Sequence, residues 1–481
     1  MLAYEELQGS QGKDIRYRPP RYPTRTLFPH MPPRLRVGSW VYQIDNISLG
    51  GVAAIAKETH DNDLRAGDTV RLTIQQSGLS IFESNARVSW AEKTIFGSRV
   101  AFGFVDHFIE IEKLINRNLQ AQIATRSSPA GANAAALVPQ EYRAFCADAL
   151  KLLRGYRAVL DSNMSVPPEF TRDFDHASVF EVCEPRLVQE WRGLWRTGND
   201  LVRGVMDERE ARDAVKEFTE LVLTPELRGG AIWDRSYAKP LGYPGDFGIM
   251  NQVYDWDLVG NDAYEMLLHR VGLEVAECIK TRMEVVRAEI GDVVAEKGVE
   301  RMARVLSLGC GSAREVETWL AKSRPAPLRA EFTLIDQEHR ALDYAYRAAY
   351  PHIVNGQGRC RVNCLHMSFI DVLRGTSAMN LLPQQDMIYS VGLFDYLADR
   401  RAAGLVRRLY ELLIPGGLLI VGNMSDTSLS NLWPMEFITD WSLHYRSEAQ
   451  MMAWTAGLGA AGAWTGTEPT GRVHLLYIRK P

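Results

Sequence analysis

The sequence predicts a multidomain protein with a small antiparallel β-barrel, a helical middle segment and a doubly wound α/β domain. At 481 residues the chain is too long for a single hydrophobic core. Apolar residues recur at every second position near the start and at helical spacing in the middle, whereas strands and helices alternate towards the end. These patterns place the barrel at 1–124, a linker at 125–139, the helices at 140–298 and the α/β domain at 299–481.

Composition limits the classes of partner. Hydrophobic residues make up 46% and charged residues 24% of the chain, and the formal net charge is -4. These values are ordinary for a globular protein and give no general attraction to nucleic acid or to an anionic membrane. The first residues lack the apolar run of a secretory signal, and no stretch approaches the roughly 18 apolar residues of a membrane span. We therefore expect no nucleic-acid partner and no membrane span.

The cysteines indicate the compartment. The chain has 6 of them, scattered as expected for reduced thiols in a large protein. Only Cys360 and Cys364 lie close together, and no His or Cys cluster completes a metal site around them. We therefore expect a cytoplasmic protein without a metal site.

Residues 34–105 carry the pattern of the barrel. Short runs of Val, Ile, Phe and Trp at a period of two are separated by Gly, Asn and Asp, which predicts an antiparallel barrel or sandwich. An amphipathic helix is expected next, over IEIEKLINRNLQAQIA. The small, polar residues that follow, with Pro at both ends, predict the linker.

The middle segment has apolar residues at a spacing of three and four, which predicts helices. Its last helix carries one apolar stripe, formed by Leu267, Val271, Val275, Ile279 and Met283. Residues 237–257, with the sequence YAKPLGYPGDFGIMNQVYDWD, interrupt this pattern with Gly, Pro, acids and aromatic residues. They predict a functional loop or a tight packing corner.

The α/β domain is expected to bind its ligand at the carboxyl ends of the strands. The first strand ends in Gly309-Cys310-Gly311-Ser312 before a helix, where glycines allow close backbone approach and N–H groups face the ligand. The second strand ends in Asp336, the position at which an acid can accept both ribose hydroxyls of a nucleoside.

Two nucleoside cofactors could fit this pattern. A dinucleotide fingerprint would need Gly at position 314, but this chain has Arg314, whose side chain interferes with a pyrophosphate. S-adenosylmethionine has no pyrophosphate and needs only the first glycine turn and the ribose acid. The turn Pro415-Gly416-Gly417 and the stretch DMIYSVGLFDYL strengthen the second interpretation.

From about 302 to 481 the chain resembles class I methyltransferases, which implies a Rossmann-like sheet and S-adenosylmethionine as the cofactor. It departs from them at Ser307, where an acid is frequent, and at the adenine position, where only Asp371 follows Met367 and Ser368. The resemblance implies cofactor contacts at Gly309, Cys310, Gly311, Ser312, Asp336, Gln337, Met367, Ser368, Ser390 and Gly392.

The stretches KPLGYPGDFGIMNQVY, GLFDYL and MEFITDWSLHYR resemble a bacterial methyltransferase family that makes 3-hydroxypalmitic acid methyl ester. This resemblance extends from about residue 140 to the end. It implies a helical lid over a small acyl substrate, with Tyr243, Asp246 and Tyr396 facing the site. Arg282 and Arg446 are then candidate bidentate partners of a substrate carboxylate.

The acceptor decides whether a base is needed. A carboxylate is already anionic at neutral pH, whereas an alcohol or amine acceptor usually needs a general base. Candidate bases are Asp246, His269, His366 and Asp395, none of which forms an evident pair. The aromatic and Met side chains of 433–445 form either an acyl channel or ordinary core.

The front of the chain carries Arg21-x-x-x-Arg25 followed by Asn46-x-Ser48-x-x-Gly51. Over about 16–120 this pattern resembles the PilZ domain, a bacterial receptor for cyclic di-GMP. Arginines can bind phosphates and stack on guanines, while the Asn and Ser fix a turn and the Gly permits an unusual backbone angle. Other arginines leave the choice of binding pair open, namely Arg16, Arg18 and Arg34.

These patterns together favour a cyclic di-GMP-regulated methyltransferase that acts on the carboxylate of a small acyl substrate. One alternative is a non-catalytic receptor that uses the methyltransferase fold as a protein-docking platform. The other is methyl transfer to an oxygen or nitrogen of a different small molecule.

Overall fold

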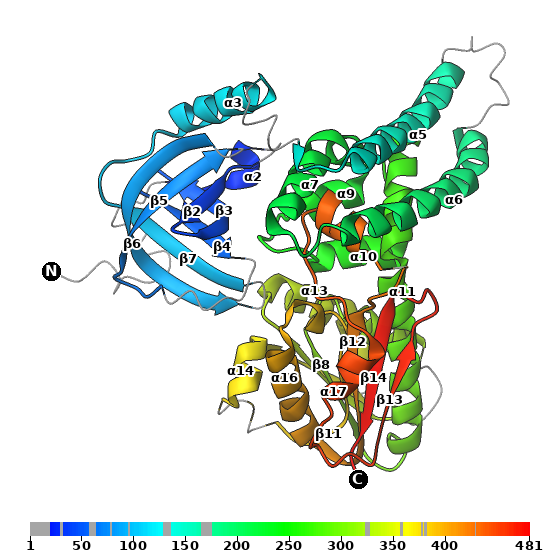
Figure 1. Ribbon diagram of the computed structural model, residues 1–481. Helices are drawn as coiled ribbons and strands as arrows, with labels where there is room; N and C mark the ends of the chain where they lie inside the picture. Colours follow the sequence, from blue (N-terminus) through cyan, green and yellow to red (C-terminus); the bar gives the residue numbers. More distant parts are fainter. Residues whose placement is uncertain are drawn as a thin grey trace. The chain divides into compact units, whose positions relative to one another are not determined.

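The computed structural model describes residues 20–28, 32–56, 64–76, 79–94, 97–127, 136–164, 176–322, 328–355, 359–376, 379, 382–428 and 430–481. The chain divides into two compact units between Leu137 and Val138 (Figure 1). Arg16, Arg18 and residues 128–135 of the expected linker lie outside the described residues. Within the described ranges, no helix combines the length and the apolarity that a membrane crossing requires.

Unit 1 is a closed antiparallel barrel, drawn in blue to cyan in Figure 1. The strand order is β3-β2-β5-β6-β7-β4, and β4 pairs again with β3, so that six strands close the barrel. Closure leaves no free edge in the ring, and the short β1 is added outside β3. The elements are β1 (Tyr22–Pro23), α2 (Thr24–Leu27), β2 (Arg34–Val37), β3 (Trp40–Ser48), β4 (Gly51–Ala56), β5 (Thr69–Gln76), β6 (Leu79–Thr94), β7 (Gly97–Phe104) and α3 (Ile111–Ser127).

The inward residues of the alternating strands fill this barrel. Leu35, Tyr42, Ile47, Leu72 and Ile74 are all fully buried, which confirms the barrel that the period of two predicted. The predicted helix is α3, which packs on β5 and β6.

Gly51 begins β4 at a point of close strand contact. A Cβ atom at this position would lie 2.4 Å from the carbonyl oxygen of Phe102 on β7. We therefore expect Gly51→Ala to lower the free energy of unfolding of the barrel by about 1–3 kcal/mol. Hydrogen exchange of the β4 and β7 amides in the full chain measures this loss. Gly103→Ala is the matched control, because Gly103 is the register partner of Gly51 and its Cβ would approach nothing closer than 3.6 Å.

If Gly51→Ala and Gly103→Ala change exchange equally, close packing is not the reason for glycine at position 51.

Unit 2 joins the helical segment and the α/β sheet through one long helix, α11, which spans 35 residues (Figure 1). α11 packs on α6, α9 and α10, and also on α12, β8 and β11. All five residues of its predicted apolar stripe are buried. The helices before the sheet are α5 (Gln140–Met164), α6 (His176–Arg203), α7 (Arg209–Val222), α8 (Thr224–Leu227), α9 (Ala231–Ala238), α10 (Phe247–Asp255) and α11 (Ala263–Lys297).

The sheet of unit 2 has the strand order β10-β9-β8-β11-β12-β14-β13. The first five strands in this order are parallel, and β14 is antiparallel to both of its neighbours. The elements are β8 (Ala303–Leu308), α12 (Arg314–Lys322), β9 (Ala330–Asp336), α13 (His339–Asn355), β10 (Cys360–His366), α14 (Phe369–Arg374), β11 (Gln385–Ser390), η3 (Phe394–Tyr396), α16 (Asp399–Glu411), β12 (Leu413–Met424), the π-helix η4 (Trp433–Ile438), α17 (Glu448–Ala453), β13 (Gly462–Thr467) and β14 (Val473–Arg479).

This order confirms the doubly wound sheet, and it is the order of the class I methyltransferase fold. The crossovers run outward from β8 in one direction and from β11 in the other, so the carboxyl ends of β8 and β11 meet at the switch point.

Two elements differ from the sequence-based expectation. Residues 237–257 are not one loop, because α10 begins at Phe247 once the Asp246 side chain caps its first turn. Strand β13 is not among the expected elements, because its glycines interrupt the alternating pattern. Trp464 of β13 stacks on Tyr477 of β14, with ring centroids 5.2 Å apart.

Candidate functional site

The glycine turn after β8 is folded tightly against β9. Gly309 and Gly311 have left-handed backbone angles, with φ of 69° and 53°, which a side chain would strain. The amides of Gly309 and Cys310 both donate to the carbonyl oxygen of Ile335, at 2.8 and 3.1 Å. The turn therefore lies directly beside the end of β9.

Asp336 connects the ends of the first two strands. Its Oδ2 accepts from the Gly311 amide and its Oδ1 from the Glu338 amide, both at 2.8 Å. Burial raises the pKa of the Asp336 carboxyl, and the two hydrogen bonds oppose this shift. Each carboxylate oxygen keeps acceptor capacity for a further donor, such as a ribose hydroxyl.

Ser312 offers a buried polar atom at the same turn. The residue is only 2% exposed, and its Oγ has no hydrogen-bond partner among the described residues. A buried hydroxyl without a partner costs about 1–3 kcal/mol, so a ligand that bonds to it would recover that energy.

These features fit S-adenosylmethionine better than a dinucleotide. The turn and Asp336 supply close backbone approach and ribose acceptors. Arg314 pairs with Asp255 at 2.7 Å and lies over the Tyr254 ring, so its side chain fills the position at which a dinucleotide site needs a third glycine.

The ends of β9 and β10 bring Gln337, Met367 and Ser368 together. The Gln337 carbonyl contacts His366 Nε2 at 3.0 Å, and the Met367 amide donates to the Asp336 carbonyl at 3.1 Å. Ser368 caps α14 in a capping box with Asp371. The hydrogen bond from the Ser368 hydroxyl lowers the pKa of Asp371, so these two side chains are engaged with one another.

At the end of β11, Ser390 and Gly392 have different surroundings. Ser390 Oγ donates to the Leu308 carbonyl at 2.8 Å and thereby joins β11 to β8. A Cβ at Gly392 would lie 3.1 Å from Nη2 of Arg282, so glycine leaves room for that guanidinium. Arg282 is 7% exposed and, among the described residues, forms no hydrogen bond or ion pair.

A buried acid that sequence reasoning missed lies beside this arginine. Glu315, in the first turn of α12, is 6% exposed and accepts from the Tyr389 hydroxyl at 2.6 Å. Burial raises the pKa of Glu315, and the charge of Arg282 opposes the shift. The Tyr254 hydroxyl lies near both charges. Burial raises its pKa most, the charge of Glu315 raises it further, and the charge of Arg282 lowers it.

The loop over residues 239–246 is seated on two aromatic side chains. Tyr396 donates from its hydroxyl to the Pro244 carbonyl at 3.4 Å and accepts from Trp441 Nε1 at 3.0 Å. Burial raises the pKa of Tyr243, and the charges of Asp336 and Glu338 raise it further. Tyr243 and Tyr396 are thus both near the strand ends.

Gly245 of this loop lies against the Trp441 ring without room for a side chain. Its φ is 73°, and a Cβ there would lie 2.4 Å from the Trp441 ring. We expect Gly245→Ala to destabilise residues 239–255 by about 1–3 kcal/mol beyond the cost of the backbone angle alone, because the ring must move. Hydrogen exchange in this segment checks the result. Gly416→Ala is the control, since Gly416 has φ of 77° with nothing within 4 Å. Equal losses for the two variants would exclude the ring contact.

Several candidate residues are occupied by structural contacts. Asp246 accepts from the Gly248 and Ile249 amides and pairs with Arg235 through both oxygens, at 2.9 and 3.0 Å. Arg446 donates to Asp399, to Asn423 and to the carbonyls of Phe394 and Leu397. These two side chains position the loop and the strand ends.

The remaining base candidates also have partners. His269 contacts the Ile232 amide and the Asp257 carbonyl through its two ring nitrogens, and burial lowers its pKa. Asp395 accepts from the Met424 amide, and burial raises its pKa.

The stretch 433–445 is mostly core. Trp433 is fully buried, packs on Trp191 with ring centroids 5.5 Å apart and donates to the Tyr142 hydroxyl at 3.0 Å. Tyr445 is the exception, because its hydroxyl is buried without a hydrogen-bond partner among the described residues. Its pKa is raised by burial and by the charges of Glu436 and Asp395, which places this hydroxyl near the strand ends.

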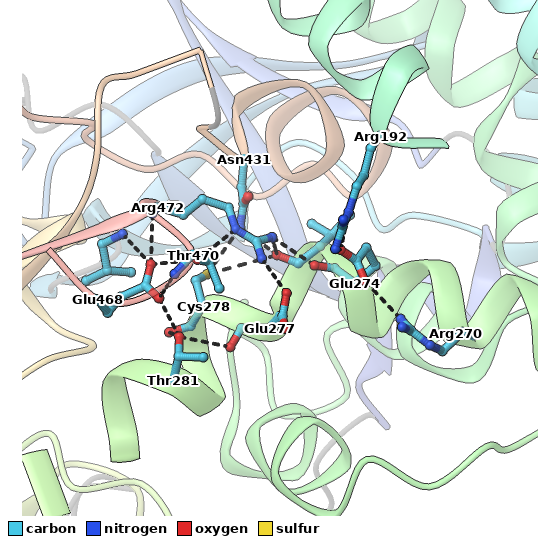
Figure 2. A network of polar contacts seen from close by, with 12 residues as sticks. Arg192, Arg270, Glu274, Glu277, Cys278, Thr281, Asn431, Glu468, Thr470 and Arg472 are labelled. Atoms are coloured by element: carbon cyan, nitrogen blue, oxygen red, sulfur yellow. Dashed lines mark hydrogen bonds and ion pairs between the residues drawn. The ribbon is translucent and has the colours of Figure 1, made fainter. Parts of the chain in front are cut away.

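A polar network fixes α11 just before Arg282 (Figure 2). Arg472 donates to the carbonyls of Glu274 and Val275 at 2.8 and 3.0 Å and pairs with Glu277 at 3.1 Å. On the other side of the helix, Glu274 pairs with Arg192 and Arg270. Helix α11 is thus held from two sides one to two turns before the buried arginine.

In unit 1, the two halves of the arginine and Asn-x-Ser-x-x-Gly pattern lie together. β1 pairs with β3 so that Pro23, between Arg21 and Arg25, lies opposite Asn46. Ser48 Oγ donates to the Gly51 carbonyl at 3.2 Å, which closes the turn between β3 and β4. Arg21 is exposed, whereas Arg25 is half-buried.

No protein-family model matches the chain, and no curated protein matches it. Among solved structures, a possible exported protein from Bordetella parapertussis is 19% identical, with 66% of this chain and 100% of that chain covered and a TM-score of 0.42. The N-methyltransferase NodS from Bradyrhizobium japonicum WM9, in complex with S-adenosyl-L-homocysteine, is 18% identical over 41% of this chain and 87% of that chain, with a TM-score of 0.29.

Magnesium protoporphyrin IX methyltransferase (ChlM) from Synechocystis PCC 6803, with bound S-adenosyl-L-homocysteine, is 13% identical over 43% of this chain and 86% of that chain, with a TM-score of 0.33. At these values the similarities carry no argument about activity. The methyltransferase-type fold of unit 2 therefore stands on the strand order of its sheet.

Proposed function

We propose that unit 2 is an S-adenosylmethionine-dependent methyltransferase for the carboxylate of a small acyl substrate, such as a 3-hydroxy fatty acid. In this proposal unit 1 is a PilZ-like receptor that binds cyclic di-GMP and regulates the enzyme. The observation that carries the methyltransferase part is the glycine turn bonded to Asp336, with the unpartnered Ser312 hydroxyl beside it.

The state of the candidate bases supports a carboxylate acceptor. When bound, S-adenosylmethionine supplies an electrophilic methyl group, which an acceptor oxygen takes as the carbon–sulfur bond breaks. An alcohol or amine would have to give up a proton in this step, but Asp246 and His269 are held by structural contacts. A carboxylate has no proton to lose, so positioning and exclusion of water are sufficient.

The residues of the site then have distinct proposed roles. Tyr243, within the loop at 239–246, and Tyr396, which bonds to that loop, line the site, and Asp246 holds the loop in place. Arg282 offers a buried cation to a ligand carboxylate. The Tyr445 hydroxyl offers a further donor on the side of η4.

The arrangement of unit 1 supports the receptor part of the proposal. Arg21 and Arg25 flank the strand pair that carries Asn46, so guanidinium groups and turn polar groups can contact one ligand. Regulation requires cyclic di-GMP to bind two states of the enzyme with different affinities. A cytoplasmic location belongs to the same proposal and agrees with six unpaired cysteines.

One incubation tests the function. The purified full chain is mixed with S-adenosylmethionine and a 3-hydroxy fatty acid, with and without cyclic di-GMP, and the methyl ester is sought by mass spectrometry. We expect the ester to form at a rate that cyclic di-GMP changes. Omission of the protein and use of the fatty alcohol in place of the acid are the controls.

Each failure identifies a different part of the proposal. If cyclic di-GMP binds but the rate of ester formation does not change, the proposed regulation is wrong. Methylation of the alcohol but not of the acid supports an O-methyltransferase for another acceptor. If S-adenosylhomocysteine does not bind at all, unit 2 is a fold without this cofactor, and the docking-platform alternative gains support.

A further inference from the structure

Two buried charges of opposite sign face the switch point of the sheet without pairing. Arg282 and Glu315 are 7% and 6% exposed, and the charge of Arg282 opposes the rise that burial causes in the pKa of Glu315. No ion pair joins them, and the side-chain partner of Glu315 is the Tyr389 hydroxyl. They come from different elements, α11 and α12, on either side of the glycine turn.

This arrangement is costly without a ligand. A buried charge that lacks a partner is strongly unfavourable, and a guanidinium normally finds several acceptors. The network around Arg472 holds the backbone of α11 at Glu274 and Val275, about two turns before Arg282 (Figure 2). A ligand with an anion and a cation a short distance apart would satisfy both residues.

An α-amino acid zwitterion has this charge pattern. The methionine end of S-adenosylmethionine is such a zwitterion. The turn at Gly309–Ser312 leads directly into the first turn of α12, which carries Glu315, and its Gly311 amide donates to the ribose acceptor Asp336. The Nη2 atom of Arg282 lies over Gly392, at the end of the neighbouring strand β11.

We propose that Arg282 binds the carboxylate and Glu315 the ammonium group of the methionine part of S-adenosylmethionine. This inference rests on the proposed function. It assigns Arg282 to the carboxylate of the cofactor instead of the carboxylate of the methyl acceptor. The Tyr389 hydroxyl donates to Glu315 at 2.6 Å, and the nearby Ser307 of β8 lowers the pKa of Tyr389, so Glu315 is held close to the first strand.

The experiment compares two ligands by titration calorimetry on the full chain. S-adenosylhomocysteine carries the zwitterion, whereas 5′-methylthioadenosine retains the adenosine and the sulfur but lacks it. For the natural chain we expect S-adenosylhomocysteine to bind at least about 100-fold more tightly, because two charge-assisted contacts are lost with the zwitterion.

Two variants then test the two residues. We expect Arg282→Met and Glu315→Gln each to lower the affinity for S-adenosylhomocysteine by about 10–100-fold. The affinity for 5′-methylthioadenosine should stay within about twofold of that of the natural chain. Arg287→Met on α11 and Glu317→Gln on α12 are controls, because they make the same substitutions on the same helices. They should leave the affinity for both ligands unchanged. The methyl-ester assay is run in parallel.

The outcomes separate this inference from the proposed function. No binding of S-adenosylhomocysteine to the natural chain overturns both. Equal affinity of the natural chain for the two ligands overturns the inference alone, and this arm needs no variant to fold. An Arg282→Met protein that binds both ligands normally but makes no ester also overturns it and returns Arg282 to the acceptor carboxylate.

Discussion

Asp336→Ala is expected to weaken the binding of S-adenosylhomocysteine by at least about 100-fold. The substitution removes the acceptors that we propose for two ribose hydroxyls, each such charge-assisted bond being worth about 1.5–3 kcal/mol. It also releases the Glu338 amide and the Gly311 amide, the second of which ties the glycine turn to the end of β9. Titration calorimetry with the full chain measures the loss, at about 1.36 kcal/mol for each factor of ten.

A matched control separates this effect from a general change of charge. Asp343→Ala removes a carboxylate from the exposed face of α13, where Asp343 pairs only with its helix neighbour Arg347 in the described residues. We expect this variant to bind as the natural chain does. Normal binding by a folded Asp336→Ala protein would contradict a nucleoside site at the ends of β8 and β9, and with it the choice of cofactor.

Loss of both Arg21 and Arg25 is expected to weaken cyclic di-GMP binding by about 10²–10⁴-fold. Each guanidinium would give up a charge-assisted contact of about 1.5–3 kcal/mol with a phosphate or a guanine. The single variants Arg21→Ala and Arg25→Ala should each cost at least about tenfold. Calorimetry at two salt concentrations measures the effect and its electrostatic part.

Arg71→Ala provides the comparison within the same barrel. Its side chain is 75% exposed on β5 and pairs with Glu83, away from the strand pair that carries Asn46. Binding that falls equally in Arg71→Ala would indicate a general attraction of the ligand to positive charge. A double variant that keeps the natural affinity would contradict the receptor proposal.

Local periodicity was enough to predict the barrel and most of the doubly wound sheet. The period of two in β2 to β7 and the helical stripe of α11 follow from which side chains must be buried. The sequence did not distinguish a closed barrel from a sandwich, because hydrogen bonds between distant strands leave no local signal in the sequence. β13 was missed because small residues replace the alternating apolar pattern.

The candidate site shows the same division. The contact between Gly311 and Asp336 could be predicted, since consecutive parallel strands end at the same edge of the sheet. The structural engagement of Asp246 and Arg446 could not, because their partners are set by tertiary packing. Glu315 gave a weak signal at most, namely an acid in the first turn after the glycine turn, which is also favourable for the helix dipole.

The continuity of α11 has a mechanical consequence for how molecules enter and leave. One uninterrupted helix packs both on the helical segment and on the sheet, and Arg472 bonds to its backbone, so α11 joins these two parts of unit 2 without a break. Residues 239–246 are held as well, because Lys239 donates to the carbonyls of Thr439 and Asp440, Asp246 pairs with Arg235, and the Pro244 carbonyl accepts from Tyr396. If unit 2 is the proposed enzyme, ligand entry that requires this segment to move must break these bonds, and their cost slows the opening.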